Sequence, residues 1–176
     1  MRLTIITCVL RPAMALEAAR SVQAAHPHPW ELEHRLRYWQ GEPDYDRRRT
    51  GPWVTSILRE ISAGWVLFVD DDNRLHPNLP ARLAEVLAAN PDARAVAFDC
   101  AYPEFGGVLT VEPRKVAPLS IDGAQVAFRH DHGLDWPDGP TADGQFYARL
   151  HQRDPGAWVF VNEVLTYHNH QVWGSV

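Results

Sequence analysis

Cysteine is scarce in this chain. Cys8 and Cys100 are the two cysteines among 176 residues, and no pair with the spacing CxxC occurs. Two cysteines do not build the disulfide framework of a small secreted domain, and they leave a four-cysteine zinc site without its ligands. Thiols that stay reduced are typical of the cytoplasm, so we expect a cytoplasmic protein.

Long apolar runs are also missing. The first apolar run, residues 3–10, is too short to cross a bilayer. Arg11 and Pro12 follow it, where a secretory signal has small residues. We therefore expect neither a transmembrane segment nor an export signal.

Positive charge is low. The chain has 17 Lys and Arg against 22 Asp and Glu, a net charge of −5, and Lys115 is its only lysine. A protein that binds nucleic acid or anionic membranes carries a basic excess, so we expect neither partner. Hydrophobic residues make up 45% of the chain, which is ordinary for a soluble globular domain, and the length suits one domain with a real core.

In the first hundred residues, two kinds of segment follow one another in turn. One kind is typical of strands, because it is apolar throughout or apolar at every second residue, and the other has apolar residues at helical spacing. Such alternation is typical of βαβ units and a mainly parallel sheet. Proline, glycine and asparagine mark the helix ends. The pattern predicts strands at residues 3–9, 32–38, 65–69 and 95–98, and helices that begin at Pro12, at Thr50 to Pro52 and at Asn78 or Leu79.

The second half is less regular and has no internal repeat. Its pattern predicts a strand at residues 124–129, a helix at 143–152 and one or two closing strands at 158–168. We expect one α/β domain over residues 1–176, with a mixed, mostly parallel sheet flanked by helices. Residues 101–176 are expected to supply loops over the carboxyl ends of the strands in residues 1–100.

Three carboxylates, Asp70, Asp71 and Asp72, follow the apolar run at residues 65–69. Open α/β sheets bind ligands beyond the carboxyl ends of their strands. Residues two apart in an extended chain point the same way, so Asp70 and Asp72 converge while Asp71 turns away. Two carboxylates about 5 Å apart repel by roughly 3 kcal/mol at an effective dielectric of about 20. A hard cation such as Mg²⁺ or Mn²⁺ offsets that repulsion and also binds diphosphate oxygens.

A simpler interpretation also fits these aspartates. They form a turn before the next helix, whose N-terminus favours negative charge. That helix is predicted to begin near Asn78, six residues beyond Asp72, which is far for such an effect. From the residues alone, the metal site and the turn both stay open.

Four segments follow one another between residues 3 and 170: "LTIITCVLRPAMALEAARSVQA", "GWVLFVDDDNRLHP", "IDGAQVAFRHDHGLDWPDGPTADGQFYARL" and "FVNEVLTYHNH". In these segments and in their order, the chain resembles the family 2 glycosyltransferases of the GT-A type over most of its length. The four segments are similar to the family's opening strand and helix, its strand before the D-x-D motif, its acceptor region and its closing strand. The resemblance implies a GT-A-like fold, with residues 1–100 as the nucleotide-sugar-binding half and 101–176 as the acceptor and closing half.

Carried over position by position, the resemblance makes Asp72 the metal ligand and Asp143 the catalytic base. Asp70 is expected near the ribose and the water shell of the metal. His168 or His170 is expected to complete the metal site. The donor side is expected to include Thr7, Cys8, Leu10 and Arg11 of the first loop, Asp71, and Arg49 of the run at 47–49.

The implied reaction is an inverting sugar transfer that depends on Mn²⁺ or Mg²⁺. The donor is a nucleoside-diphosphate sugar, with UDP- and GDP-sugars as the expected classes, and the acceptor is an unidentified glycan or small molecule. The acceptor oxygen attacks the anomeric carbon opposite the leaving group while the base takes its proton. No covalent sugar–enzyme intermediate is then needed.

Each acceptor-side residue has a structural alternative. Asp143 is also where a first-turn helix acid is favoured behind Thr141 as N-cap. Trp136 is expected to stack on a sugar ring, yet a packing role fits it equally well. His132, in one of three H-x-H strings, is expected to touch the acceptor or to lie on the surface.

The chain departs from the family in two respects. The acid that commonly follows the second strand and reads the base has no clear counterpart, because Glu42, Asp44 and Asp46 are out of register. The chain is also short, so acceptor-binding surface is reduced or comes from another subunit of a homo-oligomer. Two alternatives therefore stay open: a non-catalytic GT-A-like domain that binds a nucleotide, a glycan or a partner, and a metal-dependent phosphoester or pyrophosphate hydrolase.

Overall fold

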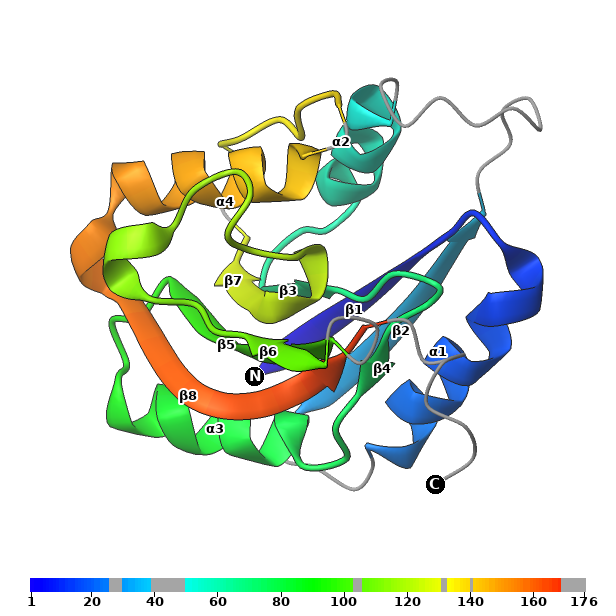
Figure 1. Ribbon diagram of the computed structural model, residues 1–176, viewed down its shortest axis with the longest axis horizontal. Helices are drawn as coiled ribbons and strands as arrows, with labels where there is room; N and C mark the ends of the chain where they lie inside the picture. The colour runs from blue at the N-terminus through cyan, green and yellow to red at the C-terminus, as the bar shows by residue number, and fades with distance from the viewer. Residues whose placement is uncertain (26–29, 39–49, 103–105, 131–132, 140, 169–176) are drawn as a thin grey trace.

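The computed structural model describes residues 1–25, 30–38, 50–102, 106–130, 133–139 and 141–168 (Figure 1). These residues form an eight-stranded sheet in the order β2-β1-β3-β7-β5-β8-β4, with β6 paired to β5. The strands are β1 (Arg2–Val9), β2 (Glu31–Tyr38), β3 (Trp65–Phe68), β4 (Arg74–Leu75), β5 (Ala95–Tyr102), β6 (Gly107–Leu109), β7 (Val126–Arg129) and β8 (Trp158–Tyr167). The helices are α1 (Pro12–Ala24), α2 (Gly51–Arg59), α3 (Leu79–Ala89) and α4 (Ala142–Arg153).

The sheet is mixed, as expected, and its longest pairings are parallel. Strand β1 lies parallel to β2 and to β3, and β5 lies parallel to β8. The antiparallel pairings are short. Strand β7 joins the two halves of the sheet, because it lies between β3 and β5 and pairs with both. The predicted mixed α/β single domain is therefore confirmed.

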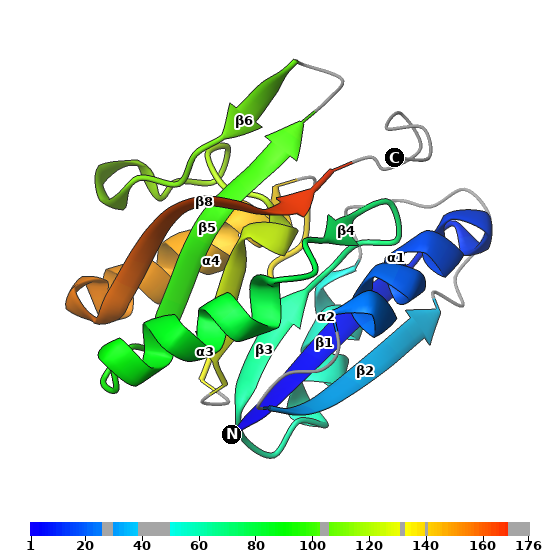
Figure 2. The ribbon, with the colours of Figure 1, turned by 90° about the horizontal axis from the view of Figure 1, so that it is seen from below.

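Helices cover both faces of the sheet. Helices α1 and α3 lie on one face, and α2 and α4 lie on the other (Figures 1 and 2). Strand β3 is apolar at every position because both of its faces are buried. Trp65 and Leu67 belong to one hydrophobic core, and Val66 and Phe68 belong to the other. A strand buried on both faces reads as a continuous apolar run.

The predicted helices and strands are present, but several bounds differ. The strand predicted at residues 124–129 begins only at Val126, because Gly123–Gln125 form a short 3-10 helix. Helix α2 ends at Arg59, and Gly64 adopts a positive φ of 116° just before β3. Strand β5 runs on to Tyr102. Strands β4 and β6 were not predicted, because two or three residues carry no readable period.

One further expectation concerns membranes. Across the described parts of the chain, no helix combines the length and the apolar character that a bilayer crossing requires.

Candidate active site

A pocket of about 240 Å³ lies beyond the carboxyl ends of β1 and β3. Loops from the second half close it, as expected for an open α/β sheet. Of the residues expected at the site, the pocket is lined by Cys8, Leu10, Arg11, Asp70, Asp71, Asp72, Trp136, Asp143 and His168. Thr50, Trp53, Val54, Phe68, Asp122, Gly123, Gly139 and Ala142 complete the lining.

Among the described residues that were expected at the site, Thr7 does not line this pocket. Thr7 is fully buried, and its hydroxyl lies 3.0 Å from Nε2 of His34 on β2. Arg49, His132 and His170 lie outside the described residues.

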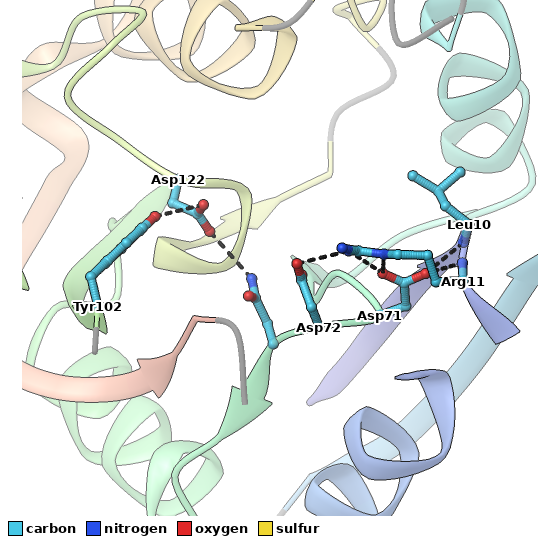
Figure 3. Close-up of polar contacts among 7 residues, drawn as sticks. Leu10, Arg11, Asp71, Asp72, Tyr102 and Asp122 are labelled. Atoms are coloured by element: carbon cyan, nitrogen blue, oxygen red, sulfur yellow. Dashed lines mark hydrogen bonds and ion pairs between the residues drawn. The ribbon is translucent and has the colours of Figure 1, made fainter. Parts of the chain in front are cut away.

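Asp71 does not turn away from Asp72 as expected, because both carboxylates bind Nη2 of Arg11, and Asp71 also holds the first loop (Figure 3). Its carboxylate accepts hydrogen bonds from the backbone amides of Leu10, at 2.7 Å, and of Arg11. The Arg11 guanidinium donates to the other oxygen, from Nε at 3.0 Å and from Nη2 at 2.6 Å. Asp71 is fully buried, so these bonds satisfy a charge that water does not reach.

Arg11 also binds the carboxylate expected to hold the metal. Its Nη2 lies 2.7 Å from Oδ2 of Asp72. The Asp72 side chain is 12% exposed and that of Arg11 is 41% exposed, so this ion pair sits at the edge of the pocket. A metal ion that enters the pocket therefore finds Asp72 already paired with the guanidinium of Arg11.

Asp70 and Asp143 approach one another across Gly123. A Cβ built on Gly123 would lie 3.8 Å from Oδ2 of Asp70 and 3.9 Å from Oδ2 of Asp143. The enclosing protein raises the pKa of Asp70 well above its ordinary value, and the negative charges of Asp122, Asp72 and Asp143 raise it further. Glycine at this position leaves the space in front of both carboxylates open.

Asp143 sits in the first turn of α4, where the sequence placed it. Thr141 occupies the N-cap position, but its side chain makes no capping hydrogen bond. Burial raises the pKa of Asp143 to about 6, the charge of Asp122 adds to this, and backbone amides of Gly144 and Gly123 partly oppose it. Burial therefore outweighs the lowering of pKa that the helix N-terminus alone implies.

Sequence reasoning missed Asp122 as a site residue. Its carboxylate accepts a hydrogen bond from Tyr102 Oη at 2.7 Å and from Asn73 Nδ2 at 3.4 Å (Figure 3). Asp122 and Gln125 form a capping box at the short turn before β7. The spacing D-x-x-Q was the available signal, because it is typical of such a cap.

Trp136 and His168 both line the pocket and both pack on other aromatic rings. The Trp136 ring lies 4.7 Å from the rings of Phe68 and of Phe146. The His168 ring stacks on Tyr102 at 4.5 Å. Trp136 therefore has the packing role that the sequence left open, while its half-buried ring still faces the pocket.

The carboxylates of this pocket suit a hard divalent cation. Five of them line it, Asp70, Asp71, Asp72, Asp122 and Asp143, and Arg11 is the one arginine or lysine among the lining residues. Oxygen ligands of this kind are those that Mg²⁺ and Mn²⁺ prefer. Within the described ranges, no group of three or more His, Cys, Asp or Glu is arranged to hold a metal. The protein therefore fits such an ion only with further oxygens from a ligand or from water.

Comparisons with known proteins rest on structure. No protein-family model and no curated protein matches the chain. It is similar to TarS residues 1–349 from S. aureus in complex with UDP-GlcNAc, with a TM-score of 0.70 and 12% identity over 95% of this chain and 58% of that one. It is similar to the mannosyltransferase PcManGT from Pyrobaculum calidifontis in complex with GDP-Man and Mn²⁺, with a TM-score of 0.67 and 16% identity over 96% of this chain and 56% of that one.

A glycosyltransferase that takes part in glycosylation of the major capsid of PBCV-1 is similar over 96% of this chain and 93% of that one, with a TM-score of 0.54 and 14% identity. The chain thus spans less than two thirds of the length of the first two structures and nearly all of the third. Because the sequence identities are 12–16%, these similarities establish the fold alone. The fold expected from the sequence is confirmed: the chain has a GT-A-like fold.

Proposed function

We propose that this protein is an inverting, divalent-metal-dependent glycosyltransferase. The observation that carries the proposal is the meeting of Asp70 and Asp72 from the end of β3 with Asp143 from α4 in one pocket of a GT-A fold. Residues 1–100 supply the donor side, and residues 101–176 supply the acceptor side and the base. The donor is a UDP- or GDP-sugar, and a homo-oligomer supplies any missing acceptor surface.

Asp143 is the general base. Its raised pKa of about 6 lies close to neutral pH, where a base is both ionised and able to take a proton. As the acceptor oxygen bonds to the anomeric carbon, its proton passes to the Asp143 carboxylate. The bond from the anomeric carbon to the phosphate oxygen breaks, and its electron pair leaves with the nucleoside diphosphate.

The charge of the pocket supports metal dependence. A nucleoside diphosphate is an anion, and it enters a pocket lined by five carboxylates and one arginine. Asp72, with Asp70 beside it and His168 or His170 as a further ligand, would hold Mn²⁺ or Mg²⁺. When bound, the metal neutralises the charge that collects on the leaving diphosphate. Arg11 contributes a second positive charge from the first loop.

The test is calorimetry with UDP-GlcNAc and GDP-Man, each with and without Mn²⁺, followed by measurement of sugar release. We expect binding that requires the metal and that Asp72→Asn abolishes. Asp143→Asn is expected to keep donor binding and to lower turnover by about 10²- to 10⁴-fold, as for a removed general base. Glu85→Gln, an exposed change on α3, is the matched control.

Two outcomes contradict the proposal. Metal-independent binding without turnover on either donor supports the non-catalytic GT-A-like domain. Release of phosphate from nucleotides that carry no sugar supports the phosphoester or pyrophosphate hydrolase.

A further inference from the structure

A second pocket, of about 420 Å³, adjoins the first. Asp122 and Asp143 line both pockets, so the two meet at the proposed base. Six of the seventeen residues that line the first pocket are charged, whereas apolar side chains dominate the second. The remaining residues that line it are Tyr102, Gly107, Val108, Leu109, Pro118, Leu119, Ile121 and Thr141.

Exposed apolar side chains gather at this pocket. Val108 on β6 is 51% exposed and Leu119 on the loop before β7 is 86% exposed. They are two of the six large hydrophobic side chains that are exposed among the described residues, and both line this one pocket. Ile121, 4% exposed, provides an apolar wall deeper inside. Ligand pockets are lined mostly by apolar side chains with a few polar groups placed among them, and this pocket has that composition.

The loop that carries Leu119 is held firmly against α4. A Cβ on Gly144 would lie 2.1 Å from the carbonyl oxygen of Pro118, so the loop backbone touches the first helical turn. Ser120 Oγ accepts a hydrogen bond from the amide of Ala117 at 2.8 Å and donates within the same turn.

The opposite wall is fixed as well. Gln125, fully buried, donates from Nε2 to the carbonyl of Leu109 at 2.7 Å and to that of Phe98 at 3.1 Å. Tyr102 is held by its hydrogen bond to Asp122 at 2.7 Å. Both walls of the pocket are therefore formed before any ligand binds.

We propose that this pocket is the acceptor subsite and that the acceptor is amphipathic, with an aliphatic or aromatic group next to the hydroxyl that reacts. The inference rests on the proposed function. The hydroxyl lies at Asp143, which takes its proton as the oxygen bonds to the anomeric carbon. The apolar group lies against Val108, Leu119 and Ile121.

The acceptor, and not the donor, fits this pocket for a chemical reason. Apolar walls do not repay the desolvation of a diphosphate, whereas they gain from the burial of hydrocarbon. The neighbouring carboxylate, Asp143, needs a proton donor in contact with it, and an acceptor hydroxyl is that donor.

The experiment compares octyl β-D-glucoside, below its micelle concentration, with methyl β-D-glucoside. Binding of each to the full chain is measured by calorimetry in the presence of UDP and Mn²⁺. We expect the octyl compound to bind at least about tenfold more tightly, because its chain is removed from water. Leu119→Ser is expected to lower that preference by about fivefold, and the double change Val108→Ser with Leu119→Ser to lower it further.

Leu16→Ser is the matched control, because Leu16 is 57% exposed on α1 and does not line this pocket. Equal binding of the two glucosides overturns the inference, as does a loss of preference in Leu16→Ser as large as in Leu119→Ser. Nucleotide-sugar binding without any octyl preference overturns this inference alone. Failure of every nucleotide sugar to bind overturns the glycosyl transfer on which it rests.

Discussion

Three consecutive aspartates at the end of β3 have three different environments. Asp70 faces other carboxylates, Asp71 is bonded to the loop at Leu10 and Arg11, and Asp72 is paired with Arg11. Asp71 and Asp72 lie in a turn that the amide of Asn73 closes on the carbonyl of Asp70, so the alternation of an extended strand does not apply to them. The partners of each carboxylate come from segments far away in the chain.

Asp71→Ala tests the role of Asp71 in holding the first loop. The change removes the acceptor of two backbone amides and of the Arg11 guanidinium. We expect a loss of about 2 to 4 kcal/mol in the free energy of unfolding, because buried donors are left without partners. Urea denaturation measures it, with the exposed Asp92→Ala as control. A loss below that of the control argues against the anchoring role.

Arg11→Gln tests competition between the guanidinium and a metal for Asp72. Without the pair at 2.7 Å, Asp72 is open to another cation. We expect Mn²⁺ to bind in the absence of nucleotide about two- to fivefold more tightly, the range of a partly exposed ion pair. Electron paramagnetic resonance of free Mn²⁺ reports the affinity. Arg20→Gln, exposed on α1, is the control, and an unchanged or weaker affinity for Arg11→Gln contradicts the idea.

The pKa of Asp143 predicts how activity depends on pH. A base with a pKa of about 6 is protonated and inactive below that value. We expect the rate of sugar transfer to rise between about pH 5 and pH 7, with its midpoint near the pKa of the base. The same raised pKa means that the folded state holds this proton more tightly than the unfolded state. The contribution of Asp143 to stability therefore falls as pH rises through about 4 to 6.

The pH profile of donor turnover, measured at saturating Mn²⁺, checks this prediction. In Asp143→Asn, the residual rate is expected to lose the rise near pH 6. A wild-type rate that stays level down to about pH 5 rules out Asp143 as the titrating base.

At the scale of elements, the first turn of α4 positions both Asp143 and the loop that carries Pro118 and Leu119. Asp143 and Gly144 are neighbours, and Pro118 of the loop contacts the Gly144 backbone directly. Tyr147, one turn further along α4, donates from its hydroxyl to the carbonyl of Gly123 at 2.9 Å. Helix α4 therefore holds two segments of the site at once.

Gly144→Ala tests that arrangement, because helix propensity alone predicts a gain of about 1 kcal/mol. The added Cβ would meet the Pro118 carbonyl at 2.1 Å, so we expect the opposite sign, a loss of about 1 to 3 kcal/mol in unfolding free energy. Gly156→Ala is the matched control, because no atom lies within 4 Å of its Cβ position. Thermal and urea unfolding of both variants give the comparison. Stabilisation by Gly144→Ala contradicts the close approach.

At the scale of the whole molecule, the sheet separates two hydrophobic cores. Leu67 in the core beside α1 and α3 is fully buried on the short central strand β3. We expect Leu67→Ala to lower the unfolding free energy by about 2 to 5 kcal/mol, because the cavity adds to the lost burial. Leu16→Ala, at an exposed position of α1, is expected to change it by less than about 0.5 kcal/mol. Similar losses in the two variants contradict this core.

Most of the fold was predictable from local pattern. Apolar runs and helical spacing located α1 to α4 and the longer strands, because these signals depend on neighbouring residues. Strands β4 and β6 escaped prediction, since they exist only through pairing with β8 and β5. The direction and position of β7 depend in the same way on β3 and β5.

The candidate site also has features that short stretches of sequence predicted and features that depend on the tertiary structure. Placement of Asp70 to Asp72 at a strand end, and of Asp143 at a helix start, followed from short stretches of sequence. The recruitment of Asp122, the ion pair of Arg11 with Asp72 and the raised pKa of Asp143 depend on long-range packing. No local sequence pattern predicts those contacts. They form only when β7 and α4 bring the second half of the chain against the carboxyl ends of the strands of the first half.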